Sequence, residues 1–270
     1  MARISVVIPT LNVENIIERS LKSVDGVDEI IVVDMGSTDK TLEICKKYGA
    51  KIFKNIPEDG NFDKNRLLGM QKATGDWILK LDSDEELTPG LQKEIKELMT
   101  ENSPKEIDGY NLYNNIFLFG RQVKYGFVKP CSHELRLIRN GKWEYNPIKF
   151  HQQIIVGGNT AFLKNRYNHY NYQSISQFLF KTNKYTDYDS KYFYREGYRV
   201  NLFGILLAPA KSFIKLFFIQ KGFLDGEFGL MVCFLYSLYN FLEKLKIYEL
   251  EHFKDSKRGP VKSGQGHLTT

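Results

Sequence analysis

The sequence is poor in cysteine and lacks the glycine-rich motifs of the commonest phosphate-binding folds. Its three cysteines, Cys45, Cys131 and Cys233, lie far apart and in no metal-binding spacing, which argues against a disulfide framework and favours a reducing compartment. No Gly-x-Gly-x-x-Gly follows the first predicted strand and no Gly-Lys-Ser/Thr loop occurs, which argues against a dinucleotide-binding fold of the usual kind and a P-loop. Any bound phosphate must then be held mainly by a metal ion and by basic side chains such as Lys64.

Two kinds of membrane segment are also missing. Met1-Ala2-Arg3 leads directly into a predicted strand without an apolar signal segment, so we expect a cytoplasmic protein. The longest run without charge, Phe228–Leu242, has 15 residues, fewer than the ~20 that a bilayer-spanning helix needs. We therefore expect the chain to lie on a membrane or dock on its own core rather than to cross a bilayer.

Acidic residues are scarce in the C-terminal part of the chain. Residues 1–100 carry 14 Lys and Arg against 18 Asp and Glu, a net charge of −4, whereas the other 170 residues carry 24 against 14, a net charge of +10. This asymmetry suggests an anionic partner, either nucleic acid or an anionic membrane surface. The composition as a whole, 42% hydrophobic and 26% charged, is ordinary for a globular protein.

The first hundred residues alternate predicted strands with predicted helices. Apolar runs bounded by turn residues predict strands at residues 4–10, 29–34 and 77–81, and residues 51–54 predict a further short strand. Ile17, Leu21 and Val24 follow at helical spacing, and a second helix is predicted over about residues 62–74. This alternation predicts an α/β fold with a mostly parallel sheet and helices on both faces.

Polar side chains stand where these strands end, at Thr10, Asp34, Asp82 and Asp84. Because the carboxyl ends of parallel strands meet at one edge of a sheet, we expect them to line one crevice. The carboxylates of Asp82 and Asp84 would repel each other unless a cation lies between them, and such oxygen ligands suit Mg²⁺ or Mn²⁺ shared with substrate phosphates. The alternative is a solvated turn that leads into a helix. After Asp34, the segment 36–39 predicts a turn, a hydroxyl cap and a first-turn acid for the next helix.

Three blocks of this region resemble those of a known enzyme family. They are Val7–Asn12, Val32–Thr41, and the segment that runs from Lys64-Asn65 through Gly75–Glu85. In residue type, order and spacing they look like the blocks of family-two, GT-A-fold, inverting glycosyltransferases. The resemblance implies a Rossmann-like GT-A domain, a nucleotide-sugar donor of the UDP type, and a divalent cation, Mg²⁺ or Mn²⁺.

The resemblance also implies roles for the matching residues at the nucleoside. Pro9, Thr10 and Leu11 would lie along the nucleoside, and Glu14 would touch the ribose. Asp34 would accept a hydrogen bond from the base, which suits a carboxylate that faces an imide N–H. The structural alternatives are a turn-forming acid at Asp34 and a first-turn helix acid at Glu14.

At the diphosphate, the resemblance implies three further residues. Lys64 stands where many relatives have Arg and would meet the base or the diphosphate. Asp82 would face the ribose or the metal, and Asp84 would ligate the metal.

The middle of the chain resembles one subgroup of this family. Residues 108–119 and 134–139 predict strands, the second closed by a turn at 140–141, with a loop expected over 120–127. Together with Tyr167-Asn168-His169-Tyr170, this layout is similar to the bacterial glycosyltransferases that build the lipopolysaccharide core.

Inverting transfer needs a group that removes the proton of the acceptor hydroxyl. The subgroup often has Val-His-Glu where this chain has Phe150-His151-Gln152, and an amide cannot act as a base. Glu134 and His151 are then the candidates for the base. Glu134 could instead pair with a nearby arginine, Arg136 or Arg139, and His151 could be a buried histidine or a third metal ligand.

The C-terminal part predicts helices, the first starting at the hydroxyl of Ser174. Residues 197–224 hold four cations and no acid, interleaved with aromatic and aliphatic residues, which is typical of an interfacial helix; the alternative is a helical cap on the catalytic domain. No nucleic-acid module is recognisable, and the apolar content is too high for an RNA-binding face. We expect a catalytic domain over residues 1–170, a membrane-peripheral helical extension over 171–253, and a tail over 254–270 that is disordered or not native.

These expectations combine into one function. The chain is predicted to be a metal-dependent inverting glycosyltransferase that moves one hexose, glucose in the first instance, from a UDP-sugar to a lipid-linked saccharide such as lipopolysaccharide core, at the cytoplasmic face of the inner membrane. The alternative is a scaffold that binds the donor but has lost turnover, as Gln152 suggests. An Asp-x-Asp phosphatase is disfavoured because its motif wants a small or hydroxyl residue where Glu86 stands.

Overall fold

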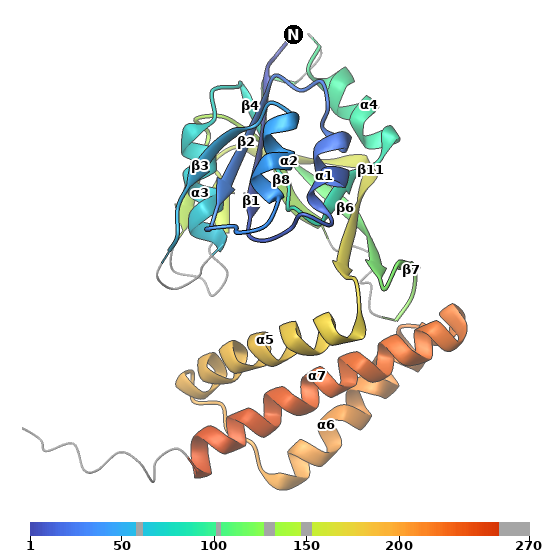
Figure 1. Ribbon diagram of the computed structural model, residues 1–270. Coiled ribbons are helices and arrows are strands. Elements are labelled where there is room, and N and C mark those ends of the chain that lie inside the picture. Colours follow the sequence, from blue (N-terminus) through green and yellow to red (C-terminus); the bar gives the residue numbers. More distant parts are fainter. Residues whose placement is uncertain (58–61, 101–103, 127–132, 147–152, 254–270) are drawn as a thin grey trace, which may run out of the picture. The chain divides into compact units, whose positions relative to one another are not determined.

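The computed structural model describes residues 1–57, 62–100, 104–126, 133–146 and 153–253. The chain divides into two compact units (Figure 1). The first is Met1–Gln122 with Pro130–Asn171, and the second is Val123–Lys129 with Tyr172–Thr270. The short segment 123–129 thus belongs with the C-terminal helices, although it lies within the chain of the first unit.

The N-terminal half of the first unit is a parallel sheet, as the alternation of strands and helices predicts. Its strands are β1 (Ile4–Thr10), β2 (Glu29–Asp34), β3 (Lys51–Lys54) and β4 (Trp77–Lys80). They are ordered β3-β2-β1-β4 and are all parallel. The helices between them are α1 (Ile17–Ser23), α2 (Thr41–Lys47) and α3 (Phe62–Lys72).

Antiparallel strands extend this sheet beyond β4 in the order β8-β6-β11-β5. They are β8 (His133–Arg139), β6 (Ile107–Leu118), β11 (Asn159–Tyr172) and β5 (Glu85–Leu87). The helix α4 (Pro89–Leu98) follows β5. Two strands, β9 (Trp143–Asn146) and β10 (Gln153–Val156), form a separate hairpin. The loop expected over 120–127 is wrong at its start, because β7 (Arg121–Val123) pairs with β6.

Apolar side chains on the two faces of the sheet form two separate cores, because successive residues of a strand point to opposite faces. On one face Val6, Ile8 and Leu79 pack with residues of α1, α2 and α4. On the other face Val7 and Ile78 pack with residues of α3. Helices therefore cover both faces of the sheet, as predicted, and the α/β fold is confirmed.

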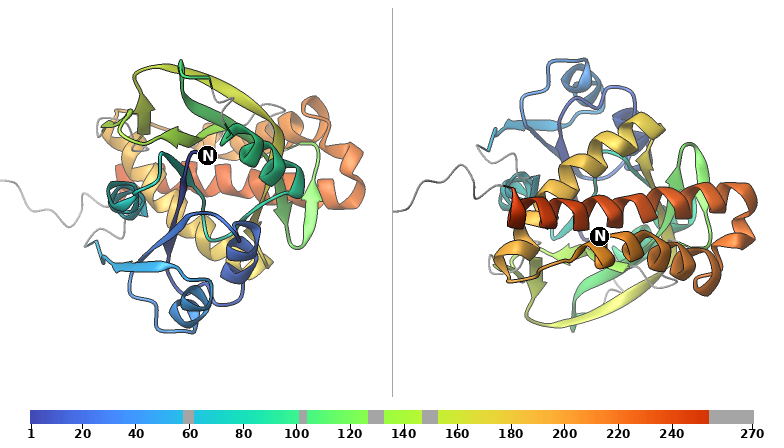
Figure 2. Two further views of the ribbon diagram at one scale, coloured as in Figure 1. Left: turned by 90° about the horizontal axis from the view of Figure 1, so that it is seen from above. Right: turned by 90° about the horizontal axis from the view of Figure 1, so that it is seen from below.

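The second unit is helical and holds α5 (Ile175–Arg195), α6 (Leu202–Ile214) and α7 (Gly226–His252). A π-helical turn, η1 (Lys215–Ile219), continues α6, and a 3-10 turn, η2 (Gly222–Asp225), precedes α7. Figure 2 shows α7 lying between α5 and α6. The predicted hydroxyl start of α5 is confirmed, since the Ser174 side chain accepts a hydrogen bond from the Gln177 N–H.

The segment 123–126 is tied to η2 within this unit. The N–H groups of Lys124 and Tyr125 both donate to Asp225 Oδ2 at 2.9 Å. Gly126 has a φ of +78°, and a Cβ atom there would stand 2.9 Å from the Cα of Gly222. Glycine is therefore required at 126 both for the left-handed backbone and for the close approach of the two chains.

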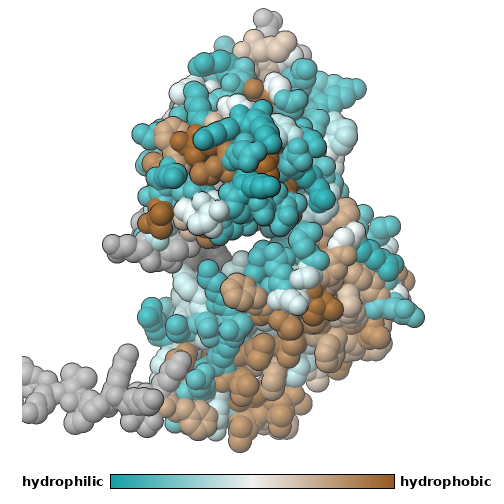
Figure 3. Space-filling view, in the orientation of Figure 1, coloured by the Kyte–Doolittle hydropathy of each residue, from teal (hydrophilic) through white to brown (hydrophobic). Residues whose placement is uncertain are grey.

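The helix formed by α6 and η1 is the most apolar part of the second unit. The 18 residues Leu202–Ile219 have a mean hydropathy of 1.8, and only 6% of them are buried. By length and composition this helix could therefore cross a membrane. The search of the sequence for a long charge-free run missed this helix, because Lys211 and Lys215 interrupt its apolar residues. Brown side chains gather over the helical unit in Figure 3.

Candidate active site

The carboxyl ends of β1 and β2 bring Thr10 and Asp34 side by side at one edge of the sheet. The two residues are register partners and both are fully buried. The carboxylate of Asp34 accepts hydrogen bonds from the N–H groups of Gly36 and Ser37, from the Ser37 hydroxyl at 2.5 Å, and from the Thr10 hydroxyl at 3.4 Å. Asp34 therefore forms the turn after β2, and its role toward a nucleoside base stays a prediction.

The predicted cap of the following helix is wrong. The cap position of α2 is Lys40, without a side-chain cap bond, because Asp34 takes the Ser37 hydroxyl. Asp39 lies before the helix and accepts a hydrogen bond from the Thr41 N–H at 3.0 Å.

Glu14 is joined to this same turn. Its carboxylate accepts a hydrogen bond from the Lys40 N–H at 2.9 Å, and its own N–H donates to Asp39 Oδ2 at 3.1 Å. It stands three residues before α1 begins, so the alternative of a first-turn acid in that helix is wrong. Of the other two nucleoside candidates, Pro9 is buried at the end of β1 and Leu11 is 36% exposed.

The acids after β4 form a tight turn between two strands rather than the start of a helix. The N–H of Asp82 donates to Glu85 Oε2 at 2.8 Å, and the N–H of Glu85 donates to the Asp82 carbonyl at 3.0 Å. The N–H of Tyr170 on β11 donates to the Asp84 carbonyl at 2.8 Å. The turn is therefore closed by its own side chains and tied to β11.

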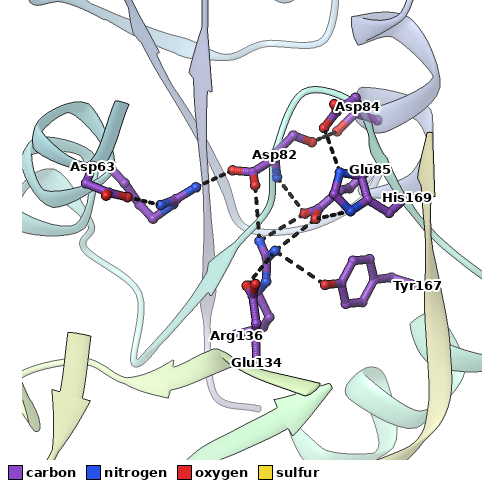
Figure 4. Close-up of polar contacts among 10 residues, drawn as sticks. Asp63, Asp82, Asp84, Glu85, Glu134, Arg136, Tyr167 and His169 are labelled. Atoms are coloured by element: carbon purple, nitrogen blue, oxygen red, sulfur yellow. Dashed lines mark hydrogen bonds and ion pairs between the residues drawn. The ribbon is translucent and has the colours of Figure 1, made fainter. Parts of the chain in front are cut away.

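Two arginines hold the side chain of Asp82 (Figure 4). Arg66 Nη2 on α3 donates to Asp82 Oδ1 at 2.6 Å, and Arg136 Nη1 on β8 lies 3.6 Å from Asp82 Oδ2. Burial opposes ionisation of Asp82, but the guanidiniums of Arg66 and Arg136 outweigh it and hold the pKa of this carboxyl well below its usual range. The predicted basic residue, Lys64, is exposed, and the cation that reaches the acid turn from α3 is Arg66.

Arg136 and Glu85 form a buried ion pair at the centre of the cluster. Arg136 Nη1 and Nη2 donate to Glu85 Oε2 and Oε1 at 3.0 and 2.9 Å, and both side chains are almost completely buried. Arg136 Nη2 also donates to the Tyr167 hydroxyl at 3.3 Å. Burial raises the pKa of Glu85 to about 7 against the pull of Arg136, and the bidentate contact favours the ionised carboxylate.

His169 reaches the same turn from β11, where it is the register partner of Glu85. Its Nε2 lies 3.6 Å from Asp84 Oδ1, and its Nδ1 lies 3.8 Å from Glu85 Oε1. Burial opposes a charged imidazole, but Asp84 and Glu85 outweigh it and raise the pKa of His169 to about 9. His169 belongs to the His169-Tyr170 motif of the sequence, and that motif by itself assigns no role to His169.

Asp84 and His169 are the side chains that fit a divalent cation. Their oxygen and nitrogen atoms are close enough to ligate one ion from two sides. Among the described residues no group of three or more His, Cys, Asp or Glu side chains is arranged for a metal. Mg²⁺ and Mn²⁺ commonly take one or two protein ligands and complete their shell with substrate phosphates and water. Asp82, the other predicted ligand, is held by arginines.

The family of the chain is decided by one match. A model of glycosyl transferase family 2 matches residues 5–167, which include β1 to β8, the acid turn and most of β11. The chain belongs to glycosyl transferase family 2.

Relatives of this glycosyltransferase match nearly its whole length. An uncharacterised glycosyltransferase of Rickettsia typhi is 29% identical over 93% of this chain and 88% of the relative. The lipopolysaccharide core biosynthesis glycosyltransferase LpsC of Rhizobium meliloti is 27% identical over 93% of this chain and 94% of the relative.

Solved structures resemble the chain more loosely. TarS 1-349 of Staphylococcus aureus covers 88% of this chain and 80% of that one, at 19% identity and a TM-score of 0.46. Glucosyl-3-phosphoglycerate synthase of Mycobacterium tuberculosis, solved with Mn²⁺ and UDP-glucose, covers 44% of each chain at 27% identity and a TM-score of 0.34.

Of the two candidate bases of this glycosyltransferase, one is placed by the structure. Glu134 lies on β8, and its carboxylate is paired with Arg136 Nη2 at 2.7 Å while the side chain remains 62% exposed. Arg136 lowers the pKa of Glu134, so the carboxylate is ionised. Arg139 pairs with Asp108 instead. His151, with Gln152, lies outside the described residues.

Sequence reasoning missed three side chains of this centre. Arg66, Arg136 and His169 come from α3, β8 and β11, and they meet the acid turn only through the packing of α3 and the order of the strands. Arg136 could have been inferred from the sequence, because residues two apart on a strand share a face and Glu134 was already a candidate for the site. Arg66 could also have been noticed, because it follows Asp63 by about one helical turn, a spacing at which charged side chains pair.

Proposed function

We propose that this glycosyltransferase is a metal-dependent, inverting enzyme that transfers one hexose, glucose in the first instance, from a UDP-sugar to a lipid-linked saccharide such as lipopolysaccharide core. The observation that carries the proposal is the acid turn after β4, which Arg66, Arg136 and His169 surround within a family 2 domain. Carboxylate, imidazole and guanidinium groups gathered at the carboxyl edge of a parallel sheet suit a charged nucleotide ligand.

The donor lies, in this proposal, along the edge formed by β1, β2 and β4. Pro9, Thr10 and Leu11 line the nucleoside, Asp34 accepts from the base, and Glu14 stands near the ribose. Asp34 is fixed by hydrogen bonds from the turn after β2, and Glu14 by the N–H of the residue before α2.

Asp84 and His169 hold Mg²⁺ or Mn²⁺ in this proposal, with Asp82 facing the ribose or the metal. When bound, the cation neutralises the charge that develops on the departing diphosphate. Arg66, with Lys64 nearby on α3, supplies positive charge at the same place. A His169 that is neutral when it ligates must first lose the proton that Asp84 and Glu85 favour.

Glu134 is the candidate for the base that lies within the described residues. An exposed, ionised carboxylate beside the acid turn can accept the proton of an acceptor hydroxyl. Its pairing with Arg136 fixes its position and weakens it as a base. His151 remains the second candidate from the sequence.

The helical unit supports a peripheral membrane location. Exposed apolar side chains and four cations without an acid over residues 197–224 suit an anionic lipid surface. We place the enzyme on the cytoplasmic face of the inner membrane, where a lipid-linked acceptor would be at hand.

Binding of UDP tests the donor site. We expect UDP to bind with Mn²⁺ and to bind about tenfold or more weakly without it, since two charge-assisted contacts depend on the cation. The variants Asp84→Asn and His169→Ala should lose this dependence on Mn²⁺, whereas Asp25→Asn, an exposed acid after α1, should keep it. Metal-independent binding that neither variant changes would overturn the assignment.

Hydrolysis of the donor separates the enzyme from a scaffold without turnover, the alternative that Gln152 suggests. Slow release of UDP from one sugar donor among a set of UDP-sugars is expected of the enzyme. A protein that binds UDP tightly and hydrolyses no donor, with or without acceptor lipid, would favour the scaffold.

A further inference from the structure

The helical unit contains a cavity that the transfer reaction does not use. It has a volume of about 560 Å³ and lies among α6, η1 and α7. Its polar lining includes Lys211, Lys215, Lys244, Ser212, Asn240 and Gln220, beside the tyrosines Tyr198 and Tyr236. None of the described residues that line it is acidic.

The lysines of this cavity are only partly neutralised. Lys244 pairs with Glu243 at 2.7 Å and lies over the ring of Tyr198. Lys211 and Lys215 have no ion pair within the described part of the chain. They stand four residues apart on one helical face, where like charges destabilise a helix, so an anion between them would remove a repulsion that the protein alone leaves in place.

Neutral polar groups of the cavity offer hydrogen bonds to a ligand in addition to the charges of the lysines. The Asn240 amide donates to Ser212 Oγ at 2.9 Å, which leaves the Ser212 hydroxyl proton for another acceptor. The side-chain oxygen of Gln220 is buried and has no hydrogen-bond partner in the described structure. Such an atom costs free energy unless a donor reaches it, and a hydroxyl of a ligand would supply one.

Apolar residues occur both in the lining of the cavity and on the outside of the same helical stretch. Val200, Ala208 and Leu216 line the cavity, while Leu206 and Ile219 of the same helical stretch are 69% and 72% exposed. Figure 3 shows apolar side chains gathered over this unit. A ligand that carries an apolar chain would meet apolar side chains in the cavity itself.

We propose that this cavity binds the phosphate headgroup of an anionic lipid, with Lys211, Lys215 and Lys244 around the phosphate and the chains directed along α6. The proposal rests on the membrane location proposed above, and it adds a built headgroup site to what would otherwise be non-specific adsorption. A lysine ammonium group binds phosphate as a point charge. Three ammonium groups around one cavity give a concentration of positive charge that suits one phosphate.

A short-chain lipid below its micelle concentration tests the site without a membrane. The full chain is titrated with dihexanoyl phosphatidic acid, dihexanoyl phosphatidylglycerol, dihexanoyl phosphatidylcholine and inorganic phosphate by calorimetry. We expect saturable binding of the two anionic lipids, with binding of phosphatidylcholine and inorganic phosphate about tenfold weaker or more. Equal affinity for inorganic phosphate would overturn the lipid assignment in favour of a free anion, and no saturable binding of any probe would overturn the site.

Matched variants locate the binding. Lys211→Gln with Lys215→Gln should weaken anionic lipid binding about tenfold or more, since a hydrogen bond to a charged group contributes at least that factor. Lys184→Gln with Lys191→Gln removes the same charge from exposed positions of α5 and should change nothing. Ala208→Phe keeps all charges and fills the cavity, so it should also abolish binding. An equal loss in both lysine pairs, or full binding by Ala208→Phe, would show adsorption by net charge and overturn the proposal.

The same variants keep this proposal apart from the proposed enzyme function. UDP binding in the presence of Mn²⁺ should be unchanged in the lysine pairs and in Ala208→Phe, which also shows that they fold. Lipid binding by a protein that binds no UDP would leave the cavity assignment standing while the donor site fails.

Discussion

Arg136 is the residue on which the charged centre depends. It is buried, it pairs with Glu85 through two hydrogen bonds, and it also reaches Asp82, Glu134 and the Tyr167 hydroxyl. Its removal would leave Glu85 as a buried charge with no guanidinium beside it, which is among the most destabilising changes a core can suffer.

We therefore expect Arg136→Leu to lower the free energy of unfolding by about 3–5 kcal/mol in urea titrations. Replacing both members of the pair, as Arg136→Leu with Glu85→Leu, should recover much of this loss, because no buried charge then lacks a partner. A double variant no more stable than the single one would show that the ion pair is not the cause.

Glu29 makes stability depend on pH at a place far from the acid turn. Burial opposes its ionisation, but Lys51, Ser5 and Thr74 outweigh it and lower the pKa of Glu29 from 4.5 to about 2. A carboxyl whose pKa is lower in the folded state stabilises the fold above its unfolded pKa and loses this contribution as the pH falls toward the folded value.

The advantage of the wild type over Glu29→Gln should therefore be about 2–3 kcal/mol at pH 6–7 and should disappear between pH 4.5 and pH 2. Urea unfolding at several pH values measures it. The exposed pair-forming residue Glu97, changed to Gln, serves as the control and should show a small difference that hardly varies with pH. A Glu29→Gln deficit that stays constant down to pH 2 would refute the assignment.

At the residue scale, the donor candidates could be found from the sequence and their contacts could not. Asp34, Asp82 and Asp84 were identifiable because each follows an apolar strand. The partner of Asp82 was not, since Arg66 and Arg136 are brought to it by packing of α3 and by the pairing of β8 with β4. Local sequence contains no information on which distant strand is the neighbour.

Among the elements, α3 is packed closely against the sheet at Gly69. A Cβ atom on Gly69 would stand 2.3 Å from Val7 Cγ1 and 3.1 Å from Val33 Cγ2. Helix propensity alone predicts that Gly69→Ala stabilises the protein by ~1 kcal/mol, whereas packing predicts the opposite sign.

We expect Gly69→Ala to destabilise the protein by about 1–3 kcal/mol, because α3 must move away from β1 to admit the methyl group. Thermal and urea unfolding give the sign directly. Gln71→Ala, at an exposed position of the same helix, should be neutral or slightly stabilising. An increase in stability for Gly69→Ala would mean that α3 is free to shift.

The strands β1, β2 and β4 were predictable because each is an apolar run bounded by turn residues, and α1 was predictable from the helical spacing of Ile17 and Leu21. β5 was not, since Glu85-Glu86-Leu87 reads as a polar turn and becomes a strand only by pairing with β11. The order β8-β6-β11-β5 joins strands that are distant in sequence, and no local pattern specifies it.

For the molecule as a whole, the proposed membrane location depends on the apolar helix Leu202–Ile219. We expect binding to vesicles that contain anionic phospholipid and loss of binding as salt rises, since surface attraction is screened. Leu206→Asp with Ile219→Asp should weaken vesicle binding by about tenfold or more, because two apolar side chains no longer enter the lipid.

Extraction of the membrane-bound protein distinguishes a surface helix from a spanning one. A peripheral protein is released by high salt or alkaline carbonate, whereas a helix that crosses the bilayer stays in the pellet and is insensitive to salt. Retention after both treatments would contradict the peripheral location.

The segment 123–126 has a consequence for anyone who recombines this enzyme with a relative. Because the second unit is assembled from two stretches of chain, exchanging everything after residue 171 would separate the N–H groups of Lys124 and Tyr125 from Asp225 and place a foreign side chain against Gly126. A working chimera has to carry both stretches from the same parent. The part that can be exchanged thus consists of two separate stretches of chain, and a chimera with a single crossover point would transfer only one of them.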